Sequence, residues 1–393
     1  MASPIFTAEH DALRIALRTF VERELAPHAD AWEAAGDFPD DVFRRMGELG
    51  FLGLHFDADD GGQGGDYITM VVLAEEMARC GSGGVSMAVS VQCEYVTPPI
   101  AKFGTAEQRA RYLRPAIEGT KIGALGITEP NAGSDVAGIS TRAERDGEEW
   151  IVNGRKTFIT NGCRADFVLL VARTDASSRH GGLSLFLVDT DTPGFRVARR
   201  LDKVGMLTSD TAELEFDTMR IPASSLLGDE GRGFQQIMWE LQGERLAAAA
   251  GACAGAQLAI ERTMEFVQVR QAFGQRLGDF QAVRHQLAEA QAQVDAVRAL
   301  TYETAWRVQQ GEYPVRLITE AKLLATRTHF DVADTCLQLH GGAGYMADHW
   351  VQRMWRDSRL ARIGAGADEV MLDYIAKAMR AGADGTGRRL AGV

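Results

Sequence analysis

"ALGITEPNAGSDV" at residues 124–136, followed by "WIVNGRKTFITNG" at residues 150–162, is the stretch that decides how this chain folds. The first segment begins as a short apolar strand, and its Pro, Asn and Gly residues then predict a tight polar turn. In the second segment Asn153-Gly154 predicts another turn, before a strand at residues 157–160. Small side chains and free backbone N–H groups would let a planar or phosphorylated ligand lie against this surface. The pattern alone is equally typical of a surface hairpin.

The composition is that of an ordinary soluble globular protein. The chain has 393 residues, 46% hydrophobic and 24% charged, which is enough for two or three domains. Its formal charge of -12 argues against nucleic acid or an anionic membrane as the main partner, because both repel an acidic surface. There is no run of about 20 apolar residues, so membrane insertion is not expected.

The N-terminus and the cysteines indicate a cytoplasmic location. Residues 1–14, "MASPIFTAEHDALR", have neither the basic and apolar regions of a secretory signal nor the arginine-rich character of a transit peptide. The five cysteines are widely spread and form no C-x-x-C pair. We therefore expect reduced thiols, with neither a disulfide framework nor a zinc site.

Hydrophobic periodicity divides the chain into three parts. Apolar residues follow a helical period to about residue 120, alternate with a period of two from about residue 121, and return to a helical period at about residue 233. This pattern predicts an α+β multidomain fold: an N-terminal helical domain at 1–120, a middle β-barrel or sandwich domain at 121–232, and a C-terminal helical bundle at 233–393.

The two opening segments, in this order, resemble the flavin and acyl-CoA signature of the acyl-CoA dehydrogenase family. The chain length agrees, and "RQAFGQRL" at 270–277 and "QLHGGAGY" at 338–345 extend the resemblance nearly end to end. The resemblance implies a helical domain, a β domain and a C-terminal four-helix bundle, in agreement with the periodicity. It also implies FAD as cofactor and the conversion of an acyl-CoA thioester to a trans-2-enoyl-CoA.

Members of this family remove the α-proton with a carboxylate while the β-hydride passes to the flavin. In many of them the base is the Glu of a C-terminal Y-E-G-T motif, but residues 364–367 of this chain read Gly-Ala-Gly-Ala. The isovaleryl-CoA and long-chain dehydrogenases instead carry their Glu on the first bundle helix, in a segment ending E-R-L. Residues 239–251, "WELQGERLAAAAG", match that segment and put Glu244 at the catalytic position.

The residues around Glu244 give this assignment partial support. Phe234, Ile237, Met238 and Leu241 form one apolar stripe, and Glu244 falls about 60° from its centre. A carboxylate at the edge of an apolar stripe would be partly desolvated, which raises its pKa toward a value useful for a base. The alternative is an exposed Glu beside an Arg on a solvated face.

The change of the C-terminal motif also concerns the substrate. Gly364 and Ala365 replace a Tyr and a Glu of the common motif, which predicts a wider pocket for a branched, bulky or medium-to-long acyl group. The resemblance implies that the backbone N–H of Ala365 still donates to the thioester carbonyl. The expected substrate-binding residues are Ser134, Arg245 and Gly364.

The cofactor contacts follow from the resemblance alone. Phe158 and Thr160 match the pair beside the isoalloxazine, and Arg270 and Phe273 match residues that bind the FAD of a neighbouring subunit. The usual Thr at Ala367 is missing. The full set of expected FAD contacts is Thr128, Phe158, Thr160, Arg270, Phe273, Gln338, Gly342 and Glu369.

These features predict an FAD-dependent acyl-CoA dehydrogenase with an electron-transfer flavoprotein as acceptor and a homotetrameric assembly, because FAD contacts cross subunits in the family. Three alternatives remain open at this point. One is the same reaction on an acyl-carrier-protein thioester. The others are a flavin-dependent monooxygenase or oxidase on this fold, and a flavin-binding chain without catalysis. The acyl chain length, the branching and the pathway also stay open.

Overall fold

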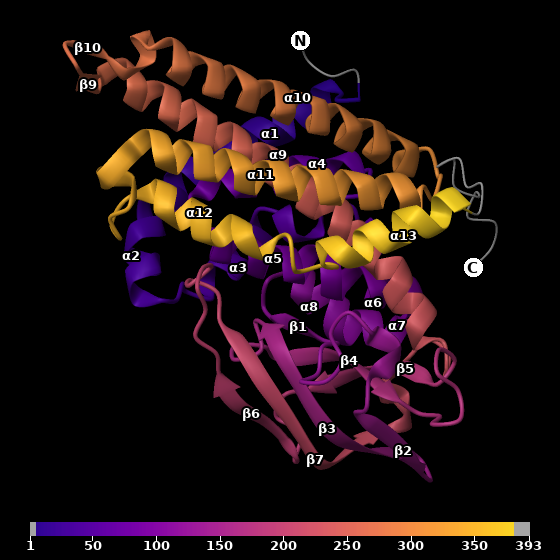
Figure 1. Cartoon of the computed structure of the whole chain (residues 1–393). Helices are drawn as coiled ribbons and strands as arrows, with labels where there is room; N and C mark the ends of the chain where they lie inside the picture. Colours follow the sequence, from indigo (N-terminus) through magenta and orange to yellow (C-terminus); the bar gives the residue numbers. More distant parts are fainter. Residues whose placement is uncertain (1–4, 381–393) are drawn as a thin grey trace.

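The computed structural model describes residues 5–380, which form three parts in chain order. Figure 1 shows the long C-terminal helices across one end of the molecule, the sheet at the other end, and the N-terminal helices packed behind and between them. This arrangement confirms the predicted α+β multidomain architecture. Residues 1–4 and 381–393, which the predicted first and third domains include, lie outside the described residues.

The N-terminal part is helical, as its periodicity predicts. A capping box is present at Thr105: Thr105 Oγ1 accepts the Gln108 N–H at 3.2 Å, and Gln108 Oε1 accepts the Thr105 N–H at 3.0 Å. The helices are α1 (Ala8–Phe20), α2 (Ala29–Ala35), α3 (Asp41–Glu48), α4 (Ile68–Met77), α5 (Gly83–Ser90), α6 (Thr97–Phe103), α7 (Ala106–Gln108) and α8 (Arg114–Ile117). Between them lie the π-helical turns η1 (Val21–Leu25), η6 (Val91–Val96) and η7 (Arg109–Leu113), and the 3₁₀ turns η2 (Ala26–His28), η3 (Phe51–Gly53), η4 (Ala58–Asp60) and η5 (Ala78–Cys80).

The middle part is a sheet with the strand order β6-β7-β3-β2-β4-β5-β8, and β1 pairs with β4 in parallel. The strands are β1 (Gly123–Gly126), β2 (Arg142–Asp146), β3 (Glu149–Thr160), β4 (Phe167–Arg173), β5 (Leu183–Asp189), β6 (Phe195–Arg200), β7 (Thr211–Pro222) and β8 (Leu226–Leu227), with the turns η8 (Val136–Gly138) and η9 (Ala223–Ser225). Nearly every side chain of β4 and β5 is buried. Burial on both faces explains why these two strands read as continuous apolar runs.

The turn predicted at Asn153-Gly154 is wrong. β3 continues through this pair, with a shift of register against β7 between Val152 and Gly154. The turn lies earlier, at residues 147–148 between β2 and β3. Gly154 instead lets β3 pack closely against Thr141, because a Cβ at this position would stand 2.4 Å from Thr141 Oγ1.

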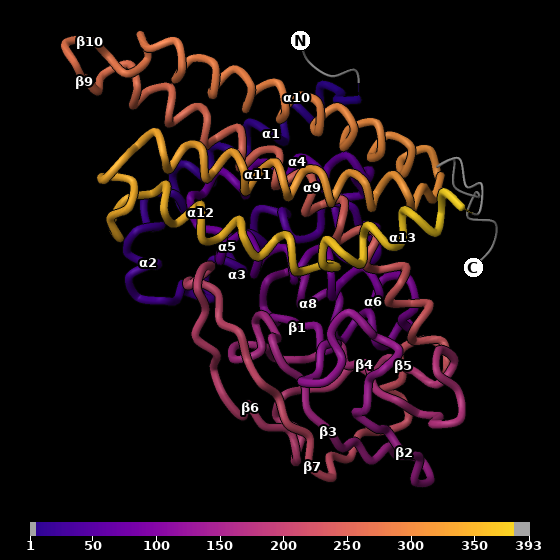
Figure 2. Tube along the Cα trace, in the orientation of Figure 1, coloured from indigo at the N-terminus to yellow at the C-terminus, as the bar shows by residue number. Residues whose placement is uncertain are grey.

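The C-terminal part is built from α9 (Gly233–Val269), α10 (Gln281–Gln309), α11 (Val315–Gly344), α12 (Trp350–Leu360) and α13 (Asp368–Arg380). A small hairpin, β9 (Gln271–Ala272) and β10 (Gln275–Arg276), and the turn η10 (Leu277–Asp279) join α9 to α10. The chain trace in Figure 2 follows α9 from beside the sheet up into the bundle. Its buried alanines and glycines let α4 and α11 pack closely against it. Within residues 5–380, no helix has both the length and the apolar character that crossing a membrane requires.

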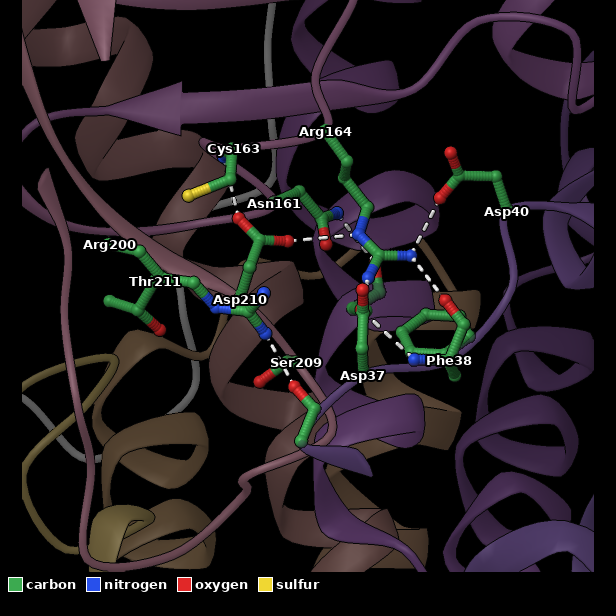
Figure 3. A network of polar contacts seen from close by, with 12 residues as sticks. Asp37, Phe38, Asp40, Asn161, Cys163, Arg164, Arg200, Ser209, Asp210 and Thr211 are labelled. Atoms are coloured by element: carbon green, nitrogen blue, oxygen red, sulfur yellow. Dashed lines mark hydrogen bonds and ion pairs between the residues drawn. The ribbon is translucent and has the colours of Figure 1, made fainter. Parts of the chain in front are cut away.

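Arg164 joins the N-terminal part to the sheet just beyond the end of β3 (Figure 3). Its Nε donates to Asp210 at 2.9 Å and its Nη1 donates to Asp40 at 2.7 Å, while Asp37 also pairs with it. Asp210 in turn accepts the backbone N–H of Cys163 at 2.6 Å. Arg164 and Asp210 are both buried, so water screens this pair weakly, whereas Asp37 and Asp40 are exposed. The network therefore fixes the chain where it leaves β3.

Candidate active site

A cavity lies between the N-terminal and the C-terminal helices. Its walls come from α4, α5 and η6 on one side and from α9, α11 and α12 on the other. On α9 the lining residues are small, and Ala247, Ala248 and Gly251 leave the space that longer side chains would fill. Met77 and Val89 add apolar surface from the opposite wall. Such a mainly apolar cavity suits an aliphatic ligand.

Glu244 stands on α9, one turn before the cavity residue Ala248. Its side chain is buried, at 6% exposure, so the alternative of a solvated surface Glu is wrong. Burial raises the pKa of Glu244 to about 7, against the opposing effect of the positive charges on Arg245 and Lys322. A carboxyl group with this pKa can accept a proton near neutral pH.

Glu240 lies one helical turn before Glu244 and is also buried, at 2% exposure. Neither of its carboxyl oxygens has a hydrogen-bond partner within residues 5–380. Burial, followed by the charge of Glu244, raises the pKa of Glu240 well above its usual range, so this group holds its proton more tightly than an ordinary carboxyl group. No described group accepts a hydrogen bond from it, so its O–H is free to turn to the neighbouring Glu244 carboxylate, an interaction that acts to lower the pKa of Glu244. The sequence analysis missed Glu240, although its spacing of four residues from Glu244 was a readable signal.

The loop between α12 and α13 is tied to the bundle by two cations. Arg245 Nε donates to the carbonyl oxygen of Ala365 at 2.9 Å, and Lys322 Nζ donates to the carbonyl oxygen of Gly366 at 2.7 Å. Ala365 has a φ of 56°, a left-handed conformation that costs a non-glycine residue about 1 kcal/mol. Its backbone N–H makes no hydrogen bond with any described residue. The loop therefore presents a free donor. Sequence analysis gave no indication of Lys322, because its partner is 44 residues away.

The signature turn after β1 rests on a buried ion pair. Lys156 Nζ donates to Glu129 Oε1 at 2.8 Å and to the Ile127 carbonyl at 2.9 Å. Glu129 also accepts the N–H groups of Ser140 and Thr141, at 2.8 and 2.9 Å. Burial acts to raise the pKa of Glu129, but Lys156 and these hydrogen bonds outweigh it and hold the pKa at about 2. The sequence analysis assigned neither member of this pair.

Four of the expected cofactor and substrate residues lie along this turn and the end of β3. The Thr128 carbonyl accepts the Thr157 N–H at 2.8 Å, which ties the turn to β3. Ser134 is exposed at the turn and Thr160 is half-buried. Phe158 is 68% exposed and has a φ of 60°. An apolar ring held outward in a strained conformation is typical of a surface that contacts a ligand.

The other expected cofactor residues lie elsewhere. Arg270 and Phe273 belong to the β9–β10 hairpin, which Figure 1 places at the end of the bundle, away from the sheet. Phe273 is 97% exposed with a φ of 51°. The rest are also exposed: Gln338 and Gly342 near the kinked end of α11, and Glu369 in the first turn of α13. A single chain therefore does not join the hairpin residues with those on β3.

Family models for the acyl-CoA dehydrogenases match nearly the whole chain. The model of the N-terminal domain matches residues 7–120, that of the middle domain residues 124–219, and that of the C-terminal domain residues 231–380. A curated relative, the mitochondrial long-chain specific acyl-CoA dehydrogenase of Mus musculus, is 38% identical over 95% of this chain and 87% of its own length.

Solved structures agree with the sequence relatives. A probable acyl-CoA dehydrogenase from Mycobacterium abscessus is 42% identical with a TM-score of 0.93, over 95% of this chain and 100% of that one. A glutaryl-CoA dehydrogenase from Mycobacterium smegmatis, solved in complex with FADH2, is 30% identical with a TM-score of 0.90, over 96% of each chain.

Proposed function

Because the chain belongs to the acyl-CoA dehydrogenase family, we propose that Glu244 removes the α-proton of an acyl-CoA thioester in an FAD-dependent α,β-dehydrogenation. The product is the trans-2-enoyl-CoA. The observation that carries this proposal is the position of Glu244: a buried carboxyl with a pKa of about 7, next to an Arg that holds the loop with the free Ala365 N–H. This feature supports grouping the chain with the isovaleryl-CoA and long-chain type of dehydrogenase.

FAD fits the residues that this chain presents. Phe158 and Phe273 expose aromatic rings from strained backbone positions, as a flavin-contacting surface requires. Bound FAD supplies the two-electron acceptor for the β-hydride. The residues that would hold it are Thr128, Phe158, Thr160, Arg270, Phe273, Gln338, Gly342 and Glu369. Since the exposed hairpin with Arg270 and Phe273 lies away from β3, a second copy of the chain would complete the site, which favours a homotetramer with FAD at its interfaces.

Each of the protein groups around Glu244 has its own part in removing the α-proton. Glu244 is partly ionised at neutral pH and takes the α-proton, while the protonated Glu240 stabilises its charged form. The Ala365 N–H donates to the thioester carbonyl and stabilises the negative charge that develops on its oxygen. Arg245 holds this donor in place through the Ala365 carbonyl.

The loop between α12 and α13 also bears on which acyl groups the enzyme accepts. Gly364 and Ala365 place no large side chain beside the reacting carbons, so the cavity takes a branched, bulky or medium-to-long acyl group. Ser134 and Arg245 would contact the CoA thioester. We expect a cytoplasmic enzyme that passes its electrons to an electron-transfer flavoprotein.

The test is anaerobic loss of the visible flavin absorbance on adding straight and branched acyl-CoAs to wild type and to Glu244→Gln. We expect the variant to bleach more slowly by about a hundredfold or more, with its FAD content unchanged. Equal rates would contradict the assignment of Glu244. No bleaching in either protein would favour an acyl-carrier-protein substrate, a monooxygenase or a chain without catalysis. Acyl-carrier-protein thioesters and peroxide assays separate these three.

A further inference from the structure

Glu94 lies in the wall of the cavity without a partner. It belongs to the π-helical turn η6, and its side chain is buried, at 6% exposure. Within residues 5–380 its carboxyl group makes neither a hydrogen bond nor an ion pair, and it faces the cavity. Burial alone raises the pKa of Glu94 to about 8, so the group is mainly a neutral acid at neutral pH.

A buried carboxyl without a partner is unfavourable for the folded chain, because the group loses its hydrogen bonds to water and gains none in return. Native proteins leave few such groups, and each calls for an explanation. Short π-helical turns occur frequently at functional sites. The position of Glu94 on such a turn, facing a cavity, indicates that a ligand supplies the missing hydrogen bond.

Most other polar side chains of the cavity wall already have partners. The Asp357 carboxylate accepts the backbone N–H of Gly83 at 3.1 Å. Ser82 Oγ shares a hydrogen bond of 2.7 Å with a threonine hydroxyl, and Ser86 Oγ donates to a backbone carbonyl at 2.8 Å. Glu94 is therefore the carboxyl group that remains available to a ligand.

His329 also lacks a partner at Nε2, but its ring is packed into a notch in α9. A Cβ at Gly255 would stand only 2.7 Å from this nitrogen, so the helix backbone covers it. No Lys or Arg is among the described residues that line the cavity. An acyl chain that ends in a carboxylate would find no cation there and would meet Glu94 instead.

We propose that the cavity binds acyl thioesters whose chain carries a hydrogen-bond donor, a hydroxyl or an amino group, which pairs with the Glu94 carboxyl. This inference rests on the proposed function, since it treats the cavity as the acyl site. A hydroxyl group suits a neutral carboxylic acid, which can both donate and accept. An amino group would instead ionise Glu94 and form a buried ion pair with it.

The test compares wild type with Glu94→Leu and Glu94→Gln as FAD-loaded enzymes. Each acyl-CoA is paired with analogues of equal length that carry a hydroxyl or an amino group at successive positions beyond the β-carbon. The readouts are the ligand concentration for half-maximal bleaching under anaerobic conditions and the shift in melting temperature on binding. Met77→Leu serves as the matched control, because it changes another cavity residue and keeps the wall apolar.

In wild type we expect one substituted series to bind about tenfold more tightly than the unsubstituted chains. Glu94→Leu should reverse this preference, whereas Met77→Leu should keep it. Glu94→Gln should keep a preference for the hydroxyl series, because its amide still forms a hydrogen bond, but should lose a preference for the amino series, because it cannot form the ion pair. The two series distinguish a neutral donor from a cationic one. The proposal is overturned if wild type and Glu94→Leu show the same ratio at every position while unsubstituted acyl-CoAs still bleach the flavin. If no acyl-CoA bleaches it, the proposed function fails, and the melting shifts still decide whether Glu94 binds the donor.

Discussion

The Arg245 guanidinium donates from Nε to the carbonyl oxygen of Ala365 at 2.9 Å, and this bond joins the helix of Glu244 to the loop that carries the free Ala365 N–H. Lys322, on α11, donates to the carbonyl oxygen of Gly366 in the same loop at 2.7 Å. Two cations, one on α9 and one on α11, therefore hold one strained loop against the bundle. The arrangement fixes the carboxyl group and the N–H donor relative to each other, although 120 residues separate Arg245 from Ala365.

Replacing Arg245 with Met tests this link. The variant keeps most of the side-chain stem but loses the charge-assisted hydrogen bond, which is worth about 1.5 to 3 kcal/mol. We expect the rate of flavin bleaching at saturating acyl-CoA to fall by about ten- to a hundredfold, with unchanged FAD content. The rate at saturation is the informative measurement, because Arg245 is also an expected substrate contact and weaker binding alone would change only the concentration dependence.

Arg262→Met is the matched control, because it removes an Arg from the same helix α9 at a position outside the cavity wall. This variant should bleach at the wild-type rate. If Arg245→Met also reaches the wild-type rate at saturation, the hydrogen bond to Ala365 does not position the donor.

The pair of Glu240 and Glu244 predicts a change in the pH profile. Activity needs Glu244 as a carboxylate, so the rate falls as the pH drops through the pKa of this group, which is about 7. Glu240→Met removes the donor that lowers the pKa of Glu244, and the acid limb should move to higher pH. At neutral pH we expect the rate of flavin bleaching in Glu240→Met to be about two- to tenfold lower than in wild type. Bleaching rates across the pH range measure this shift.

Glu240→Gln distinguishes the effect of a hydrogen bond from Glu240 from the effect of its side-chain packing. The amide N–H can still donate toward Glu244, so the acid limb of this variant should stay near that of wild type. Equal shifts in the Met and Gln variants would mean that Glu240 acts through packing and not through its proton.

The catalytic candidate came from a local pattern together with a resemblance. The apolar stripe of α9 and the family-like E-R-L segment point to Glu244, and the structure buries this side chain one turn before the cavity residue Ala248, while its catalytic role stays a prediction. Glu240 was within reach of the same reasoning, since four residues of spacing put it on the same helix face. The three-part fold was also predictable, because the period of the apolar residues changes twice along the chain.

Contacts between distant segments were not predictable. Lys322 and Arg245 gain their roles from carbonyl groups of a loop that only the folded bundle brings to them. Nothing in the sequence separates Glu94 from its polar neighbours Ser90 and Gln92, because its missing partner is a property of the folded cavity. The turn at Asn153-Gly154 was wrong because pairing with β7 on both sides of the bulge keeps β3 extended. Tertiary pairing outweighs local turn propensity there.

Phe273 tests whether two copies of the chain share a cofactor site. Its ring is 97% exposed at the tip of the β9–β10 hairpin, and within one chain it meets the ring of Phe280 edge-on, with 6.4 Å between the ring centroids. If the ring packs on the FAD of a second copy, as proposed above, Phe273→Ala should lower FAD content by about tenfold at equal protein concentration. Absorbance of bound flavin and sedimentation velocity measure cofactor content and assembly together.

Ile15→Ala is the control for Phe273→Ala, because Ile15 is also an exposed apolar residue, at 69%, and lies on α1. This variant should keep the wild-type FAD content and mass. If Phe273→Ala also keeps the wild-type FAD content and mass, the hairpin takes no part in the cofactor site.

Lys156→Met should destabilise the protein and reduce its retention of FAD, because the fully buried Glu129 carboxylate loses its cation. Breaking a buried ion pair on one side costs about 3 to 5 kcal/mol. Glu129 has a folded pKa of about 2, below the ordinary value of about 4.3, and burial lowers the pKa of Lys156 to about 8, so the pair stabilises the fold fully only between the ordinary carboxyl value and about pH 8. The stabilisation is lost as the pH falls through about 2.

The double variant Lys156→Met/Glu129→Gln removes both charges and should recover part of the loss of stability, since no buried charge is then left unpaired. Melting temperatures at neutral and acid pH measure both effects, and a single variant as stable as wild type at neutral pH would show that the pair does not support the signature turn.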